Sequence, residues 1–126
     1  MTAKGLLVSV IDDDESVRES LPDLIKEFGY SVRAFSSAEE FLASDAVERT
    51  KCLILDIAMP RMTGPDLQRE LSRRPEKIPI VFITANRDET IRSKVLALGA
   101  VECLYKPFSD TALLAALHAA LPASSA

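Results

Sequence analysis

One stretch of this chain predicts how the rest is arranged. It reads Lys51-Cys52-Leu53-Ile54-Leu55-Asp56 and is followed by Ile57-Ala58-Met59-Pro60. Its unbroken apolar run from Cys52 to Leu55 is typical of a strand that is buried on both faces of a sheet. The run ends on Asp56 and leads into turn residues. In open α/β sheets, ligands bind beyond the carboxyl ends of the strands, so Asp56 is a candidate site residue.

Strand and helix patterns alternate along the rest of the chain. Strands are predicted to begin near residues 6, 31, 51, 79 and 101. Apolar residues at helical spacing follow each of them: Val17 to Phe28, Phe41 and Leu42, Leu67 and Leu71, Ile91 to Leu98, and Leu113 to Leu121. Parallel neighbours need a crossover of about a dozen residues or more, so five such units predict a doubly wound parallel sheet.

Helix boundaries carry their own signals. Ser37-Ala38-Glu39-Glu40 predicts a capping box at the start of the second helix. Gly64-Pro65 opens the third helix, with proline in its first turn. Ser109 is the expected cap of the last helix.

Length and composition fit one domain. A chain of 126 residues with 48% hydrophobic content can bury a core without disulfides or structural metals. We expect a domain over residues 1–121 and a tail, or the start of a linker, over residues 122–126. The net charge of -4 and the scattered basic residues argue against direct nucleic-acid binding by this chain.

The apolar run after Lys4 is too short for a signal peptide or a membrane span, so we expect a cytoplasmic protein without a membrane partner. Cys52 and Cys103 lie singly in strand-like runs and are expected to be buried, reduced thiols. His118 is expected at the surface of the last helix. This placement removes most histidine-based catalytic and metal sites.

Polar residues follow four of the five predicted strands: Asp12 and Asp13, Asp56, Thr84, and Lys106. Because parallel strands point the same way, these side chains are expected to meet at one edge of the sheet. The second strand ends in Phe35-Ser36-Ser37 without a charged group, as expected of a strand away from the site. If the strand order is 2-1-3-4-5, the topological switch point falls between the first and third strands, between the acidic pair and Asp56.

Three carboxylates at one edge repel each other, so at least one pKa is expected to rise unless a cation lies among them. Carboxylates suit Mg²⁺, which commonly takes one or two of them together with a phosphate oxygen. Lys106 adds a fixed positive charge, and the Thr84 hydroxyl can donate to a phosphoryl oxygen. The set predicts a phosphoryl-transfer site with Asp56 as nucleophile.

These motifs together resemble a receiver domain of the bacterial two-component response regulators, and the pattern from Val17 to Phe41 is similar to the FixJ-type branch. The matching motifs are Ile11-Asp12-Asp13, Leu55-Asp56 with Met59-Pro60 and Gly64, Ile83-Thr84-Ala85, and Lys106-Pro107-Phe108. The resemblance covers Lys4 to Leu121. It implies a flavodoxin-like (βα)5 three-layer sandwich and a signalling domain whose only chemistry is self-catalysed phosphotransfer and autodephosphorylation.

The resemblance also implies roles at the acidic end of the site. Asp56 takes a phosphoryl group from the phosphohistidine of a sensor histidine kinase. Asp13 and Asp56 bind Mg²⁺ directly, Asp12 acts mainly through water, and Ala58 offers its main-chain carbonyl. Ala58 also matches a variable position that tunes access of the hydrolytic water.

On the other side of the site, the resemblance implies that the Thr84 hydroxyl swings onto the phosphoryl group and that the Ala85 amide faces the same oxygens. Lys106 pairs with the phosphoryl group, and the family usually holds the Lys106–Pro107 bond in the cis form. Asn86 matches the second variable position that bears on the phosphate lifetime.

One position departs from the family pattern. The family usually places Tyr or Phe three residues before the lysine, where Cys103 stands here. Tyr105 has the same strand parity, although it lies about 7 Å further along the strand. We therefore expect activation to work through the helix over Ile91–Leu98 and its preceding loop, with Tyr105 adapting at the surface.

The expected partner surface is formed by the helix over Ile91–Leu98, the last strand and the last helix. Its candidate residues are Lys94, Glu102, Tyr105 and Asp110. A phosphorylation-dependent homodimer is the expected assembly. No helix-turn-helix follows Leu121, so the chain is expected to be either a stand-alone receiver or, as the FixJ-type pattern favours, the amino-terminal part of a transcription regulator.

Other interpretations stay open. A haloacid-dehalogenase-type phosphatase uses similar residues, but it needs a second acid where Ala58 stands. A flavin carrier would place the cofactor phosphate against the acidic run from Asp12 to Glu15, which repels it. A degenerate receiver that binds partners without phosphorylation fits Cys103 but not the intact acids. A plain acidic helical turn leaves Asp56 and Lys106 unexplained.

Overall fold

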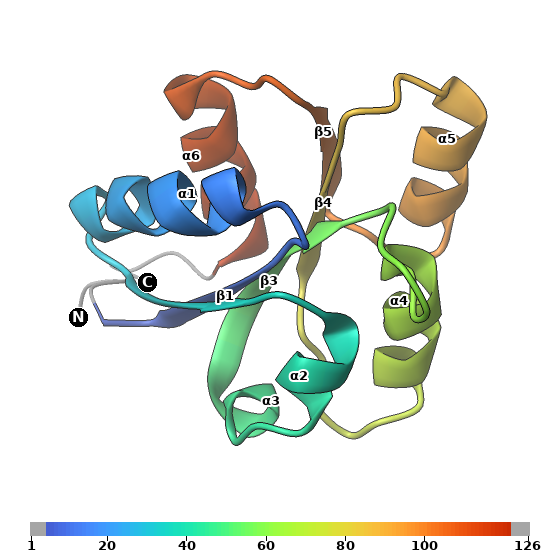
Figure 1. Ribbon diagram of the computed structural model, residues 1–126, viewed down its shortest axis with the longest axis horizontal. Coiled ribbons are helices and arrows are strands. Elements are labelled where there is room, and N and C mark those ends of the chain that lie inside the picture. The colour runs from blue at the N-terminus through green and yellow to red at the C-terminus, as the bar shows by residue number, and fades with distance from the viewer. Residues whose placement is uncertain (1–4, 122–126) are drawn as a thin grey trace.

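The structure is a computed structural model that describes residues 5–121 (Figure 1). Its elements, in chain order, are β1 (Leu7–Ile11), α1 (Glu15–Glu27), β2 (Ser31–Phe35), α2 (Ala38–Leu42), α3 (Ala46–Arg49), β3 (Thr50–Asp56), α4 (Gly64–Ser72), β4 (Ile80–Thr84), α5 (Glu89–Ala97), β5 (Glu102–Tyr105) and α6 (Asp110–Ala120). The tail predicted over residues 122–126 lies outside the described residues.

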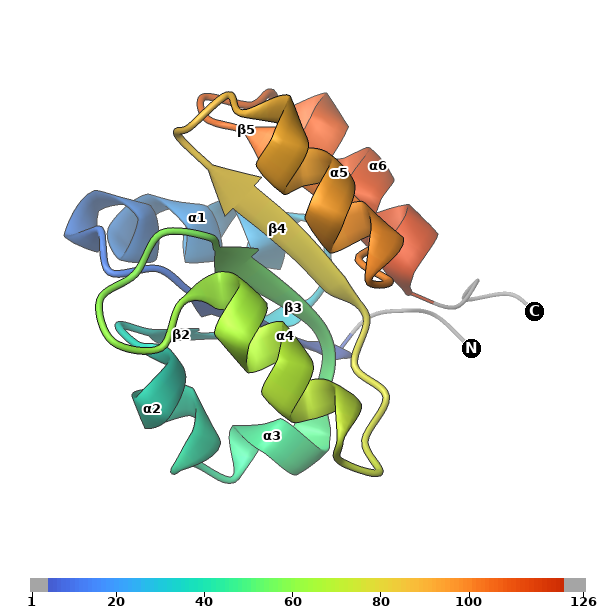
Figure 2. The same cartoon turned by 90° about the vertical axis from the view of Figure 1, so that its right-hand side faces the viewer.

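The five strands form one parallel sheet in the order β2-β1-β3-β4-β5, as predicted. Helices α1 and α6 cover one face, and α2, α3, α4 and α5 cover the other (Figures 1 and 2). The predicted three-layer sandwich is confirmed. Within residues 5–121, no helix has both the length and the apolar character that a membrane crossing requires.

The position of β3 in the centre of the sheet explains why its sequence is apolar without interruption. Leu53 and Leu55 pack into the core beneath α4, whereas Cys52 and Ile54 pack into the core beneath α1 and α6. Successive side chains of a strand point to opposite faces, so a strand covered on both sides needs apolar residues at every position. Lys51 is the one exposed residue of β3.

The single-residue expectations outside the site agree with the structure. Cys52 and Cys103 are free, buried thiols, and burial raises the pKa of Cys52 to about 12. His118 is exposed. None of these three groups is placed for nucleophilic or metal chemistry.

The structure departs from the predicted elements between β2 and β3. The capping box at Ser37 is half formed: its hydroxyl accepts from the Glu40 amide, but the Glu40 carboxylate accepts from the Ser36 amide at 2.6 Å. Helix α3 was not predicted, since four residues give no periodicity. It buries Ala46, whose carbonyl accepts from the Thr50 hydroxyl at 2.7 Å.

The start of α4 approaches the end of β3 very closely. The Thr63 hydroxyl accepts from the Asp66 amide, and the Asp66 carboxylate accepts from the Thr63 amide. This capping box places Gly64 so that a Cβ atom on it would lie 2.5 Å from the Asp56 carbonyl oxygen. The contact requires glycine.

Gly64→Ala is therefore expected to destabilise the domain by about 1–3 kcal/mol, because the new methyl group forces the β3–α4 loop away from Asp56. Urea unfolding measures the change, with Ser72→Ala at the exposed end of the same helix as the control. An alanine variant as stable as the wild type would contradict the close approach.

Candidate functional site

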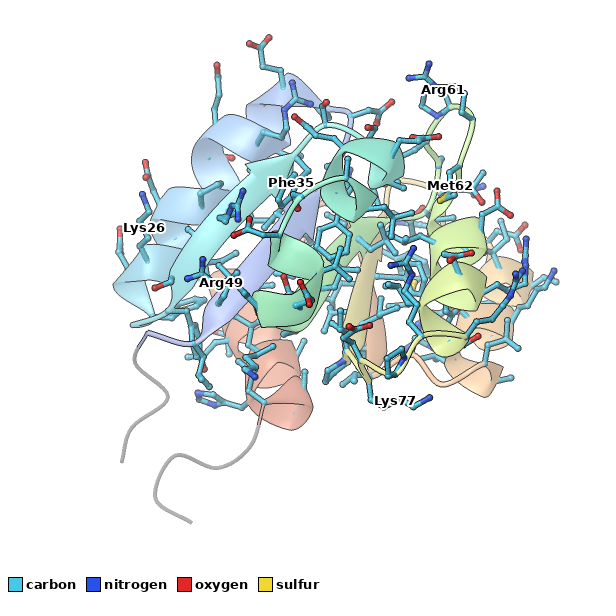
Figure 3. All side chains as sticks on the ribbon, turned by 90° about the horizontal axis from the view of Figure 1, so that it is seen from below. Lys26, Phe35, Arg49, Arg61, Met62 and Lys77 are labelled. Carbon is cyan, nitrogen blue, oxygen red and sulfur yellow. The ribbon has the colours of Figure 1, made fainter. Side chains whose placement is uncertain are left out.

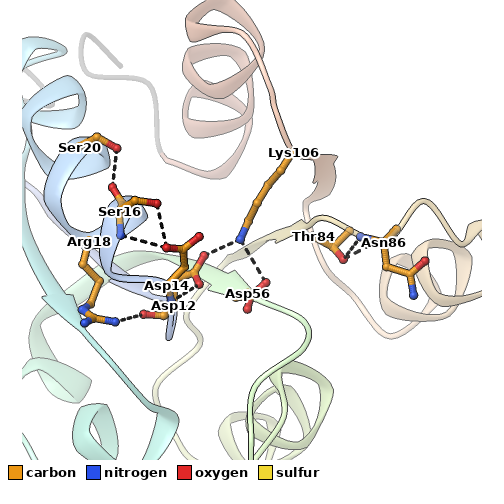
Figure 4. Close-up of polar contacts among 9 residues, drawn as sticks. All are labelled: Asp12, Asp14, Ser16, Arg18, Ser20, Asp56, Thr84, Asn86 and Lys106. Carbon is orange, nitrogen blue, oxygen red and sulfur yellow. Dashed lines mark hydrogen bonds and ion pairs between the residues drawn. The ribbon is translucent and has the colours of Figure 1, made fainter.

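The carboxyl ends of the strands bring the predicted polar residues together, and Figure 4 draws four of them, Asp12, Asp56, Thr84 and Lys106. Asp12 and Asp13 follow β1, and Asp56 ends β3. One carboxylate oxygen from each of the three lies within 4.8 Å of the others. Lys106 follows β5, and its Nζ lies 2.8 Å from Asp12 Oδ2 and 3.6 Å from Asp56 Oδ1.

Asp12 is buried and held at both ends of its carboxylate. Oδ1 accepts from the Asp14 amide at 2.9 Å, and Oδ2 accepts from Lys106. The Asp14 side chain caps α1 by accepting from the Ser16 amide at 2.9 Å. Asp13, between them, is exposed. The acidic loop is thus fixed on both sides of Asp13.

The electrostatics of the site centre on Asp56. Burial and the neighbouring Asp12 charge raise the pKa of Asp56 from 3.8 to about 7, although Lys106 opposes this rise. Burial acts to lower the pKa of Lys106, but its hydrogen bond to Asp12 and the Asp56 charge raise it above its ordinary value. One lysine therefore does not neutralise the acidic cluster.

The donor set fits a hard divalent cation. Carboxylate oxygens on three residues converge, and Ala58, two residues beyond Asp56, lies in an exposed loop position. Oxygen donors of this kind suit Mg²⁺, which also relieves the repulsion among the acids. Asp12, Asp13, Asp56 and the Ala58 carbonyl are the groups available to hold it.

Thr84 and Lys106 are joined through the main chain, since the Lys106 amide donates to the Thr84 carbonyl at 2.8 Å. The buried Thr84 hydroxyl accepts from the Asn86 amide at 3.0 Å, within its own loop. Ala85 is exposed beside it. The Lys106–Pro107 bond is cis, as the family resemblance implied.

The loop after β3 is shaped by features that the sequence analysis missed. The Gly64 amide donates to the Ile57 carbonyl at 3.0 Å and closes the loop. Arg61 has a φ of 64°, in the left-handed region, and projects from the loop (Figure 3). Glycine is the residue that usually signals this conformation, and its absence hid the turn.

Cys103 and Tyr105 take different places although they share a strand face. Cys103 is 2% exposed and lies in the core cluster that contains Val95 of α5. The Tyr105 hydroxyl donates to Glu89 Oε2 at 2.9 Å, and the Arg87 guanidinium lies 5.1 Å from its ring centroid. Tyr105 is therefore held near the surface by residues at the start of α5.

A second contact joins α5 to β5. Arg92 Nη2 donates to Glu102 Oε1 at 3.0 Å, and the same oxygen accepts from the Cys103 amide at 2.9 Å. Sequence reasoning missed Glu89 and Arg92 of α5 and Arg87 of the preceding loop, because charged residues carry no signal of their partners in the sequence. Of the four predicted partner-face residues, Lys94 and Asp110 are exposed, whereas Glu102 and Tyr105 are half-buried.

The model of the family described as response regulator receiver domain matches residues 8–118. The chain belongs to this family.

Two curated relatives and one solved structure illustrate the similarity of this receiver domain to known proteins. Response regulator protein TodT of Pseudomonas putida is 41% identical over 121 residues, which cover 96% of this chain and 53% of TodT. Transcriptional regulatory protein FixJ of Azorhizobium caulinodans is 36% identical over 122 residues, 97% of this chain and 58% of FixJ. The crystal structure of FixJ-N has a TM-score of 0.84 at 35% identity and covers 93% of this chain and 94% of FixJ-N.

The comparisons place the receiver domain in two-component signalling and confirm the FixJ-type resemblance. The chain spans about half the length of the curated relatives it matches. What those longer proteins do as a whole is a separate question from the role of this domain.

The raised pKa of Asp56 predicts a pH-dependent stability of the metal-free receiver domain. The folded state binds this proton more tightly than the unfolded state, so Asp56 lowers stability as the pH rises from about 4 to about 7. Asp56→Asn removes this loss. We expect the variant to exceed the wild type by about 2–4 kcal/mol at pH 8 and by much less at pH 4.5.

Urea unfolding in the presence of a chelator measures both differences. Asp23→Asn, which removes an exposed carboxylate from α1, is the matched control and should give a small difference at both pH values. Parallel pH profiles for the wild type and Asp56→Asn would contradict the prediction.

Proposed function

We propose that this receiver domain accepts a phosphoryl group on Asp56, in a Mg²⁺-dependent reaction, from the phosphohistidine of a sensor histidine kinase. The observation that carries the proposal is the convergence of Asp12, Asp13 and Asp56 within 4.8 Å, with Lys106 beside Asp56. A carboxylate nucleophile needs its negative charge compensated before it meets a phosphoryl group, which is itself negative.

The acidic residues have different roles in holding the cation that compensates this charge. Asp13, Asp56 and the Ala58 carbonyl hold Mg²⁺ directly, and Asp12 contributes mainly through water. The bound ion supplies positive charge that favours the ionised Asp56 and neutralises phosphoryl oxygens. Because the pKa of Asp56 is about 7 in the metal-free protein, cation binding competes with a proton below neutral pH.

Lys106, Thr84 and Ala85 receive the phosphoryl group on the other side. Lys106 Nζ is already 3.6 Å from Asp56 Oδ1, so a small movement away from Asp12 brings it to a phosphoryl oxygen. The Thr84 hydroxyl exchanges its contact with the Asn86 amide for a phosphoryl oxygen, and the Ala85 amide donates to the same group. Ala58 and Asn86 then tune how readily water reaches the phosphoryl group.

The switch runs from Thr84 to the contacts between α5 and β5. Movement of Thr84 displaces the loop that leads into α5. Glu89, the first residue of this helix, accepts the hydrogen bond from the Tyr105 hydroxyl. Cys103 leaves no aromatic ring to turn inward at the usual position. Release of Tyr105 from Glu89 therefore takes the place of aromatic gating in this domain.

The partner surface lies over α5, β5 and α6. Lys94 and Asp110 are exposed there, and Glu102 and Tyr105 become available when their α5 contacts break. This surface supports a phosphorylation-dependent homodimer. The output is transcription control through a DNA-binding segment, since the chain covers 58% of a relative that is named a transcriptional regulatory protein.

Cys103 supports a second candidate function. A receiver that lacks the inward aromatic residue can act as an interaction module without phosphorylation. The complete set of acids with Lys106 and Thr84 favours the phosphoacceptor. The phosphatase alternative lacks its second acid at Ala58, which makes the domain a signalling module with no substrate other than itself.

Incubation with Mg²⁺ and a small acyl-phosphate donor should increase the intact mass by one phosphoryl group. Asp56→Asn should abolish the increase, because the carboxylate nucleophile is gone, and Asp45→Asn on the distant α2–α3 turn should leave it intact. A wild-type protein that binds Mg²⁺ but gains no mass would favour the unphosphorylated interaction module.

Tyr105→Phe should shift the unphosphorylated domain toward its active conformation, because it removes the hydroxyl bond to Glu89. The amide resonances of α5 should move part of the way toward their phosphorylated positions. Tyr30→Phe, in the core beneath α1, is the control, and α5 resonances that stay unmoved in Tyr105→Phe would contradict the switch.

A further inference from the structure

A side chain outside the acidic cluster holds the main chain between two of its members. Arg18, near the start of α1, donates from Nη1 to the Asp12 carbonyl oxygen at 2.9 Å (Figure 4). That carbonyl belongs to the planar peptide unit that joins Asp12 to Asp13. The hydrogen bond from Arg18 therefore fixes the orientation of the peptide plane that leads into Asp13.

The orientation of the Asp13 carboxylate depends on this peptide plane more than the orientations of the Asp12 and Asp14 carboxylates do. The Asp12 carboxylate is held by the Asp14 amide and Lys106, and the Asp14 carboxylate is held by Ser16. The Asp13 carboxylate is exposed, and none of the hydrogen bonds found among residues 5–121 is accepted by it. The direction of this carboxylate is thus set by its main chain.

Arg18 has two opposite effects on a cation in the site. As a positive charge, its guanidinium repels a divalent cation and weakens binding. As a donor to the Asp12 carbonyl, it holds Asp13 toward Asp56 and strengthens binding. The sign of the change in Mg²⁺ affinity on removing Arg18 shows which effect dominates.

We propose that Arg18 is a positioning residue of the Mg²⁺ site, acting through the Asp12–Asp13 peptide. This inference rests on the proposed function, in which Asp13 and Asp56 hold the ion. Groups that orient metal ligands without touching the metal typically change metal affinity by about 10–100-fold. We expect the orienting effect to outweigh the repulsion, because Arg18 is half-buried and its hydrogen bond to the Asp12 carbonyl, of ordinary length at 2.9 Å, restricts its movement.

Calorimetric titration with Mg²⁺ of the full chain tests the inference. Arg18→Met should bind the ion about tenfold more weakly than the wild type. Arg18→Lys, which keeps both a donor and the charge, should recover part of the loss. Lys26→Met is the charge control, since it removes a positive charge from the far end of α1 (Figure 3) and should change the affinity little.

Equal or tighter binding by Arg18→Met would overturn the inference and leave only charge repulsion. Arg18→Gln serves the same test if the methionine variant does not fold, because it also removes the charge and is too short to replace the anchor. Acyl-phosphate labelling gives a second readout: the Mg²⁺ concentration for half-maximal rate should rise in Arg18→Met, while the rate at saturating Mg²⁺ approaches that of the wild type. A wild-type protein that binds no Mg²⁺ would instead contradict the proposed function.

Discussion

Two buried carboxylates that share one lysine are the constraint on which this structure depends. Asp12 and Asp56 end adjacent strands, are 0% and 5% exposed, and both face Lys106. Burying like charges side by side is unfavourable unless a further cation joins them. The folded state tolerates this electrostatic repulsion at one edge of the sheet because apolar clusters on both faces hold the strands in place. In the proposed function, the same repulsion is what makes this edge suited to a cation and to phosphoryl chemistry.

In the proposed function, the sheet order links this local constraint to a surface of the domain. Because β1 and β3 are neighbours, the acids meet, and because β4 and β5 follow on one side, Thr84 and Lys106 reach the same edge. Helix α5 lies between the loop after Thr84 and the contacts at Tyr105 and Glu102. The proposed switch therefore runs from Asp56 to the surface over α5 and β5 through a short path of packed elements.

The sequence was sufficient for the parallel sheet and for the gathering of its final polar residues at one edge, because both rest on patterns that do not need coordinates, whereas the strand order did not follow from any residue pattern. Apolar runs marked the strands, and parallel strands place their final polar residues at one edge. Helix α3 was not predicted because a single helical turn shows no periodicity in its apolar residues. The contact of Arg18 was not predicted because its partner is a main-chain carbonyl, which every residue carries. The Thr63 cap was missed although Thr63 and Asp66 have the spacing of a capping box. The Tyr105–Glu89 contact depends on how α5 sits on β5, which the spacing of residues does not determine.

We propose that one divalent ion binds among Asp12, Asp13 and Asp56, beside the carboxylate that accepts the phosphoryl group. Crystals grown with Mn²⁺ in place of Mg²⁺ test it most directly, because Mn²⁺ prefers the same oxygen ligands and gives an anomalous signal. We expect a single anomalous peak in contact with Asp13, Asp56 and the Ala58 carbonyl. A peak elsewhere, or none at saturating Mn²⁺, would contradict the account.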